Sequence, residues 1–148
     1  MKEQTLKERS QEVSRHNPFV QLVGIEIEEV GQDCSRLRLA IRPECLNPHG
    51  LVHGGALFTL ADNAAGCAAS TDGWTYVTQA SDIHFLHTVA SGSVLAEAQV
   101  KHRGRSTVLV EVSLRGEDDR LLATASFSYF CVNGSEIEHN SPVAARRA

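Results

Sequence analysis

The sequence predicts an α+β domain in which one antiparallel sheet of five or six strands wraps around a single long buried helix. The helix is predicted over residues 53–70, an alanine-rich and almost wholly apolar segment, because an apolar surface on all sides is typical of a helix that is buried on most sides. Six β-rich segments flank it, two before and four after. A run of strands served by one helix is typical of the α+β class.

The elements before the buried helix are predicted to be a short helix and two strands. Residues 2–15 intersperse charged residues with a few apolar ones, as a weakly amphipathic helix does, and Asn17-Pro18 ends the pattern. Apolar residues recur over 23–30, which we expect to form the first strand. The second is expected over 37–41, where arginines alternate with apolar residues and leave one face in water.

After the buried helix the chain returns to strands and remains in them to about residue 132. We expect these strands over residues 75–87, 94–102, 107–115 and 121–132. Residues 133–148 are polar or small and are expected to form a flexible tail, which leaves a core of about 17–132 within a single domain of 1–148. One helix cannot cover a sheet of this size, so exposed edges and apolar faces predict a homodimer or homotetramer.

Composition and charge narrow the possible classes of protein. The 148 residues suit one domain, and a hydrophobic content of 42% can fill its core. The net charge of -4 gives no sign of the clustered Lys and Arg that bind nucleic acid. No segment has the roughly 20 apolar residues that cross a bilayer, and the charged N-terminus lacks the apolar stretch of a signal peptide. We therefore expect a cytoplasmic protein with reduced cysteines and no nucleic-acid or membrane partner.

A carboxylate stands within the predicted buried helix. Gly55, Thr59, Asp62 and Gly66 are spaced 4, 3 and 4 residues apart, so they share one small, polar face. Burying a carboxylate without a cationic partner is costly, and no Lys or Arg occurs between positions 43 and 101. Asp62 is therefore a candidate general base or nucleophile. The alternative is a structural carboxylate that accepts hydrogen bonds from the backbone or from a hydroxyl such as that of Ser81.

The start of this helix offers a second chemical group. In His53-Gly54-Gly55 the glycines leave backbone N–H groups unobstructed at a helix N-terminus, where they can stabilise a carbonyl oxygen as it becomes an oxyanion. The alternative is an ordinary glycine turn. Gly54 and Asp62 are eight residues apart, or about 12 Å along a helix axis, so one carbonyl cannot contact both groups of one helix. If both act on it, they come from different subunits of a two-fold dimer.

These residues together resemble a known family. The segment Asn47-Pro48-His49-Gly50-Leu51-Val52-His53-Gly54-Gly55, followed by Asp62, is similar to the signature of the PaaI-type hotdog thioesterases. Segments around 17–26, 82–86 and 100–107 also resemble parts of that family, so the match covers nearly all of residues 17–132. The resemblance implies the hotdog fold and hydrolysis of acyl-CoA thioesters, with an aromatic or medium-chain acyl group, without a cofactor or metal.

The resemblance also implies catalytic roles. Asp62 would be the general base or nucleophile, and the backbone N–H of Gly54 would donate to the oxyanion with help from the helix dipole. Asn47 would hold the thioester oxygen or the attacking water, and His53 would orient the turn and lie near the carbonyl. Without the resemblance, ordinary turn-stabilising roles are favoured for His53 and Asn47.

Substrate-binding roles follow from the same resemblance. Some members of the family hold the attacking water with a Ser or Thr on the strand after the helix. Here the corresponding position is Ala80, which leaves Ser81, Thr59 or Asn63 to fill that role. The segment at a strand turn that would meet the phosphates of CoA contains Arg103, Gly104 and Arg105, which otherwise suit a solvated hairpin end. The expected substrate-binding residues are Gly55, Asn63, Ser81, Arg103, Gly104 and Arg105.

Two other functions compete with thioester hydrolysis. Hotdog folds also serve as acyl dehydratases or hydratases, which use a His and a carboxylate, and a non-catalytic acyl-CoA-binding module would keep the pocket without needing Asp62. A metal enzyme is disfavoured because His49 and His53 lie on a loop without a Glu between them. A predicted strand places His84 and His87 on opposite faces.

Overall fold

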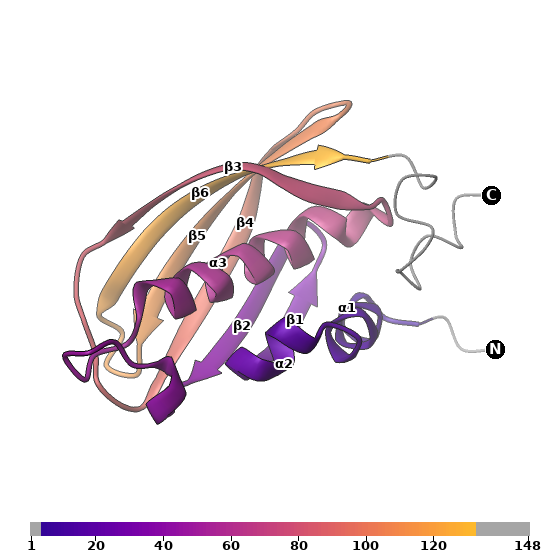
Figure 1. Ribbon diagram of the computed structural model, residues 1–148. Helices are drawn as coiled ribbons and strands as arrows, with labels where there is room; N and C mark the ends of the chain where they lie inside the picture. Colours follow the sequence, from indigo (N-terminus) through magenta and orange to yellow (C-terminus); the bar gives the residue numbers. More distant parts are fainter. Residues whose placement is uncertain (1–3, 133–148) are drawn as a thin grey trace.

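The computed structural model describes residues 4–132, which form one six-stranded antiparallel sheet around a long helix (Figure 1). The strands run in the order β1-β2-β4-β5-β6-β3. This arrangement confirms the predicted fold class. The elements are α1 (Leu6–Arg15), α2 (Pro18–Val23), β1 (Ile25–Gly31), β2 (Cys34–Ala40), η1 (Pro43–Cys45), α3 (Gly54–Ala69), η2 (Ser70–Asp72), β3 (Tyr76–Phe85), β4 (Ser93–Arg103), β5 (Thr107–Gly116) and β6 (Leu121–Cys131). The tail predicted over 133–148 lies outside the described residues.

Helix α3 lies along the inner face of the curved sheet and makes most of its sheet contacts with the three central strands β2, β4 and β5 (Figure 1). Its alanines explain the close fit, because their short side chains let the strands approach the helix backbone. Five of them are fully or almost fully buried: Ala61, Ala64, Ala65, Ala68 and Ala69. Leu60 and the sheet residues Leu39, Val110 and Phe127 fill the remaining core around the helix.

The segment before the sheet differs from the prediction, because it contains a second helix. We expected Asn17-Pro18 to end the first helix and Val23 to begin a strand, but α2 starts at Pro18 and includes Val23. The side chain of Asn17 accepts a hydrogen bond from the backbone N–H of Val20 at 3.3 Å and so caps α2. Proline is favourable at the first position of a helix, where its missing N–H is not needed. Gly24, in the left-handed conformation at φ 86°, ends the helix.

Strand β3 is the exposed edge of the sheet. It pairs with β6 on one side, and no described residue pairs with its other edge. All of its residues except Tyr76 and Ile83 are exposed. The apolar side chains of Val77 and Phe85 are 42% and 51% exposed. An edge strand with exposed apolar side chains is a surface that proteins ordinarily cover by association.

No disulfide joins the four cysteines. Three of them lie partly buried and Cys45 is buried. Over residues 4–132 no helix combines the length and the apolar character needed to span a bilayer.

Candidate active site

The Asp62 side chain is held by two hydroxyl groups from distant strands. The hydroxyls of Thr78 on β3 and Tyr129 on β6 each lie 2.7 Å from Asp62 Oδ1 and donate to it. The Tyr129 hydroxyl also lies 2.6 Å from the backbone carbonyl oxygen of Asp62. No described residue donates a hydrogen bond to Oδ2. One carboxylate oxygen is therefore fixed and the other is open to a ligand.

Tyr129 is suited to remain a hydrogen-bond donor. Its side chain is buried, and burial together with the nearby Asp62 carboxylate raises the pKa of Tyr129 far above its usual range. The hydroxyl therefore keeps its proton and never competes with Asp62 as an anion. Thr78 and Tyr129 were not predicted from the sequence. Each lies in an ordinary strand pattern, and only the fold places its hydroxyl next to α3.

A β-bulge explains which hydroxyls of β3 face α3. The pairing between β3 and β6 shifts by one residue between Thr78 and Ala80, so Gln79 has no partner in the register. Thr78 is paired with the inward-facing Tyr129, whereas Ala80 is paired with Ser128 on the other face. The bulge therefore places Ser81, opposite the buried Phe127, on the same face as Thr78.

The N-terminus of α3 presents one unused backbone donor. His53 is the N-cap, and its Nδ1 accepts a hydrogen bond from the Gly55 N–H at 2.8 Å. Since Nδ1 is the acceptor, the proton of the neutral ring lies on Nε2, where it can be donated to a ligand. The Gly54 N–H has no acceptor among the described residues. The first turn of the helix thus leaves Gly54 as its open donor.

Asn47 organises the loop that leads into α3. Its Oδ1 accepts hydrogen bonds from the backbone N–H groups of His49 and Leu51, at 2.9 and 3.1 Å. The turn-stabilising role is therefore present. The side-chain NH₂ group of Asn47 has no acceptor among the described residues and can still donate to a ligand.

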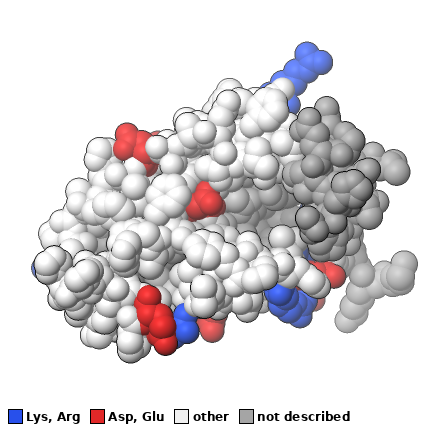
Figure 2. Space-filling model, viewed as in Figure 1, with Lys and Arg blue, Asp and Glu red and all other residues white. Residues whose placement is uncertain are grey.

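A cavity of about 430 Å³ opens beside Asp62. It lies between α1, the second half of α3 and the start of β3, and its walls include Val13, Gly66, Trp74 and Val77. This volume is within the range of small-molecule sites. Figure 2 shows that this face of the molecule is largely uncharged, with an acidic group near its centre at the edge of a hollow. The surroundings therefore suit an apolar ligand group next to a carboxylate. Asn63 also lines the cavity, and its side-chain amide donates to the carbonyl of Thr59 at 2.8 Å.

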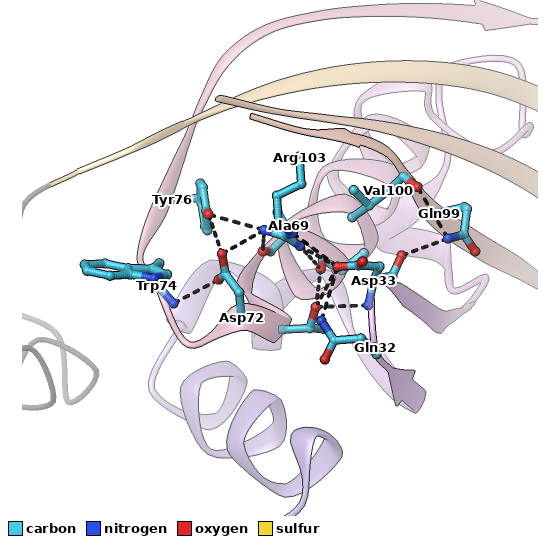
Figure 3. Close-up of polar contacts among 11 residues, drawn as sticks. Gln32, Asp33, Ala69, Asp72, Trp74, Tyr76, Gln99, Val100 and Arg103 are labelled. Carbon is cyan, nitrogen blue, oxygen red and sulfur yellow. Dashed lines mark hydrogen bonds and ion pairs between the residues drawn. The ribbon is translucent and has the colours of Figure 1, made fainter. Parts of the chain in front are cut away.

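Arg103 lies in an ion-pair network at the C-terminal end of α3 (Figure 3). Its guanidinium donates to Asp33 Oδ1 at 2.7 Å, to Asp72 Oδ2 at 2.9 Å and to the carbonyl of Ala69 at 2.9 Å. A cation is favourable at this end of a helix. Only 23% of the side chain is exposed. The Arg103 guanidinium is thus engaged in ion pairs and is not a solvated hairpin end.

The two residues after Arg103 form the turn between β4 and β5. The Gly104 N–H donates to the carbonyl of Thr107 at 2.8 Å, and a side chain at this position would crowd that oxygen at 3.1 Å. Arg105 is exposed. In contrast to Arg103, its side chain has no hydrogen-bond or ion-pair partner within residues 4–132.

Along α3 the predicted site residues fall into three groups. Asn47, His53, Gly54 and Gly55 lie at the N-terminal end, Asp62 and Asn63 lie near the middle, and Arg103 contacts the C-terminal end. The eight residues between Gly54 and Asp62 correspond to about 12 Å along the axis. A single chain therefore does not bring the open N–H of Gly54 and the carboxylate of Asp62 onto one ligand atom.

The chain is similar in sequence to known thioesterases. Residues 49–123 match the family model described as the thioesterase superfamily. The acyl-coenzyme A thioesterase PaaI of Escherichia coli is 31% identical over 102 residues, which cover 68% of this chain and 73% of that protein. A putative esterase of Mycobacterium tuberculosis is 31% identical over 112 residues, covering 72% of this chain and 80% of that protein.

Solved structures of similar proteins share this fold. A thioesterase of Haemophilus influenzae superposes with a TM-score of 0.79 at 28% identity, covering 88% of this chain and 92% of that one. A protein of Streptococcus mutans, solved with acetyl CoA bound, superposes with a TM-score of 0.71 at 26% identity, covering 74% of this chain and 89% of that one. The family match spans about half of the chain and includes the segment from His53 to Asp62. The chain therefore belongs to the thioesterase superfamily.

Proposed function

We propose that this protein hydrolyses acyl-CoA thioesters that carry an aromatic or medium-chain acyl group, releasing the free acid and CoA. The observation that carries the proposal is the asymmetric setting of Asp62. Two hydroxyls hold Oδ1 at 2.7 Å, whereas no described residue donates a hydrogen bond to Oδ2, and Asp62 lines the cavity. A carboxylate fixed in this way is oriented for attack, since its open oxygen does not have to give up a protein hydrogen bond.

In the proposed reaction Asp62 Oδ2 delivers water to the thioester carbonyl. As general base it takes a proton from water while the water oxygen attacks the carbonyl carbon. As nucleophile it attacks the carbonyl itself, and water then hydrolyses the resulting anhydride. The C–S bond breaks when the tetrahedral intermediate collapses, and CoA leaves as a thiol. Appearance of ¹⁸O in Asp62 after single-turnover hydrolysis in labelled water would establish the nucleophilic route, because only an anhydride that water opens at its aspartyl carbonyl transfers the label to Asp62.

The N-terminus of α3 supplies the complementary group. The open Gly54 N–H and the positive end of the helix dipole suit the oxygen that becomes negative during attack. Asn47, in the loop before this helix, and His53, its N-cap, have side-chain N–H groups available and are proposed to hold the thioester oxygen or the water. Arg105, exposed on the β4–β5 turn, is the proposed contact for the CoA phosphates, whereas Arg103 is proposed to be structural.

We propose that each active site is formed by two copies of this chain. Gly54 and Asp62 are too far apart on one helix to act on one carbonyl. The exposed edge of β3 carries apolar side chains and contributes Thr78 to the Asp62 site. Two chains joined at this edge around a two-fold axis would run their α3 helices antiparallel, so the Gly54 of each would approach the Asp62 of the other. A dimer would then contain two sites.

The proposed activity is tested by following thiol release from a panel of acyl-CoA esters. Wild-type protein is expected to release CoA, and Asp62→Asn is expected to lower kcat by roughly 10²–10⁴ while leaving the fold and the oligomeric state intact by circular dichroism and light scattering. Near wild-type turnover in Asp62→Asn would overturn the catalytic assignment. Failure of wild type to cleave any ester would favour a dehydratase or an acyl-CoA-binding module.

The shared site has a separate test based on mixed oligomers. Asp62→Asn chains and Gly54→Pro chains are each expected to be inactive alone. A heterodimer of the two would contain one site with both residues intact and one with neither, so purified heterodimer should regain about half of the wild-type rate. If verified heterodimers stay inactive, the two groups do not come from different chains.

A further inference from the structure

Gly66 is a glycine in the interior of α3, one turn after Asp62 on the same face of the helix. It lines the cavity that opens beside Asp62. Glycine is a poor residue for a helix interior, and alanine is the best. A glycine at this position therefore needs an explanation from its surroundings.

The protein itself leaves room for a side chain at position 66. Among residues 4–132, and apart from the backbone of the helix itself, a Cβ built there would come no closer than 3.6 Å to any atom, the nearest being the Tyr129 hydroxyl oxygen. That is an ordinary van der Waals distance. The two glycines at the start of α3 differ, because a Cβ at Gly54 would meet the Phe85 ring at 3.3 Å and one at Gly55 would meet the His53 ring at 3.0 Å. What the missing side chain of Gly66 keeps free is space in the cavity.

We propose that Gly66 sets the size of the acyl group that the protein accepts, and that the cavity between α1 and α3 holds an apolar acyl group bulkier than acetyl. This inference rests on the proposed thioester hydrolysis. The carbonyl would lie at Asp62, and the remainder of the acyl group would pass over Gly66 toward Trp74 and Val77.

Helix α1 forms the opposite wall of this cavity. It packs mainly against β1 and α2, and it lies at the same end of the molecule as the last turns of α3 (Figure 1). Leu6, Ser10 and Val13 recur at helical spacing and line the cavity, although no residue of α1 is buried. The inner face of α1 is therefore mixed: Leu6 and Val13 offer apolar contacts to a ligand, while the charged residues Arg9 and Glu12 also line the cavity.

The α3 wall of the cavity also carries a thiol, that of Cys67. Burial raises the pKa of the Cys67 thiol to about 11, and a hydrogen bond with Ser10 lowers it only in part. Cys67 therefore stays protonated near neutral pH and presents an uncharged surface. It does not compete with Asp62 as a nucleophile.

The test combines turnover with binding for wild type, Gly66→Ala and Gly66→Val. The turnover arm measures kcat/KM for acetyl-, butanoyl-, octanoyl- and phenylacetyl-CoA. The ratio of octanoyl to acetyl kcat/KM is expected to fall at least tenfold in Gly66→Ala and further in Gly66→Val, because one methyl group in a close-fitting pocket changes selectivity by roughly 10–200-fold. The binding arm measures Kd for the non-hydrolysable thioethers S-octyl-CoA and S-ethyl-CoA, and only the octyl compound should bind more weakly.

Further variants separate a selectivity role from a structural one. Gly66→Ala should keep or raise the thermal unfolding midpoint, since alanine favours the helix. Val13→Ala, which enlarges the cavity from the α1 side, should shift the ratio toward bulkier acyl groups. Lys7→Ala, on the exposed side of α1, is the matched control and should leave the ratio unchanged.

The outcomes separate this inference from the proposed function. An equal loss for all four esters in Gly66→Ala, or an unfolding midpoint well below that of wild type, would overturn the selectivity role. If wild type cleaves no ester but Gly66→Val selectively weakens S-octyl-CoA binding, the hydrolytic function fails and the acyl cavity stands. If S-octyl-CoA binds all three proteins equally, the cavity is not the acyl site.

Discussion

The two ends of α3 are built in opposite ways. At the N-terminal end, the Gly54 N–H, the Asn47 NH₂ group and His53 Nε2 have no partner among the described residues. At the C-terminal end, the carbonyl of Ala69, the carboxylate of Asp72 and the guanidinium of Arg103 satisfy one another in a closed network. The N-terminal end of a helix exposes backbone N–H groups and the C-terminal end exposes backbone carbonyls. In α3 the carbonyl of Ala69 has a side-chain partner, whereas the N–H of Gly54 has no partner among the described residues.

The difference indicates which end is available to a substrate. Polar groups at a helix end that lack hydrogen-bond partners reduce stability unless water or a ligand satisfies them. Their presence at the N-terminal end of α3 therefore favours a role in binding. The C-terminal end has a structural role. Arg103, at the end of β4, bonds to α3, to Asp33 in the β1–β2 turn and to Asp72 in η2. Variants at the open end should therefore change turnover, and variants at the closed end should change stability.

The largest expected effect is at Gly54. Gly54→Pro removes the open N–H but keeps a residue that is favourable at the first helical position, and His53 already has the extended backbone that a following proline requires. We expect kcat to fall by about 10²–10³ with little change in the unfolding midpoint. Gly54→Ala adds the same Cβ against Phe85 and keeps the N–H, so it is the matched control. Equal losses in both variants would attribute the effect to crowding of Phe85 instead of the lost donor.

A smaller effect, on stability, is expected at Arg103. Arg103→Leu leaves Asp33 and Asp72 without their shared cation and should lower the free energy of unfolding by roughly 1.5–3 kcal/mol, measured by urea denaturation. Turnover per folded molecule should change little. Arg105→Ala is the contrasting variant: it should raise KM for acyl-CoA severalfold without changing stability. A large rise in KM for Arg103→Leu at full stability would assign the CoA phosphates to Arg103 after all.

The smallest and most specific effect is a pH dependence at Asp33. The hydrogen bond from Arg103 holds the pKa of Asp33 below its ordinary value. The ionised carboxylate therefore stabilises the fold at pH values above the unfolded-state pKa of about 3.9. This contribution is lost as the pH falls through the lower, folded-state pKa. Asp33→Asn should therefore be less stable than wild type at about pH 7, and the difference should shrink toward about pH 3. Asp119→Asn replaces another aspartate with positive φ and controls for the backbone effect of the substitution. A difference that stays constant with pH would contradict the ion-pair account.

The sequence was sufficient for the parts of the molecule that local pattern determines. The long apolar helix, the strand-rich remainder and the loop from Asn47 into His53 all follow from spacing within short segments. Helix α2 was missed because Asn17-Pro18 was interpreted as the end of one helix, although the same dipeptide is also a favourable helix start. A stop signal and a start signal coincide there, and only the fold separates them.

The partners of Asp62 and Arg103 could not be predicted, because they meet across large sequence separations. Tyr129 reaches Asp62 from 67 positions away, and Arg103 reaches Asp33 from 70 positions away. No periodicity in a short segment encodes such a contact. The motif located the carboxylate, and the sheet register determined which hydroxyls hold it.

The bulge at Gln79 has a consequence for how relatives of this chain are aligned. One unpaired residue in β3 exchanges the inner and outer faces of everything that follows, so Ser81 instead of Ala80 faces the helix. Gaining or losing a bulge would therefore change which sequence position of β3 points its hydroxyl toward the helix. The inward-facing hydroxyl would shift by one position in an alignment. An alignment that scores β3 column by column would record a lost serine where the molecule has only moved it.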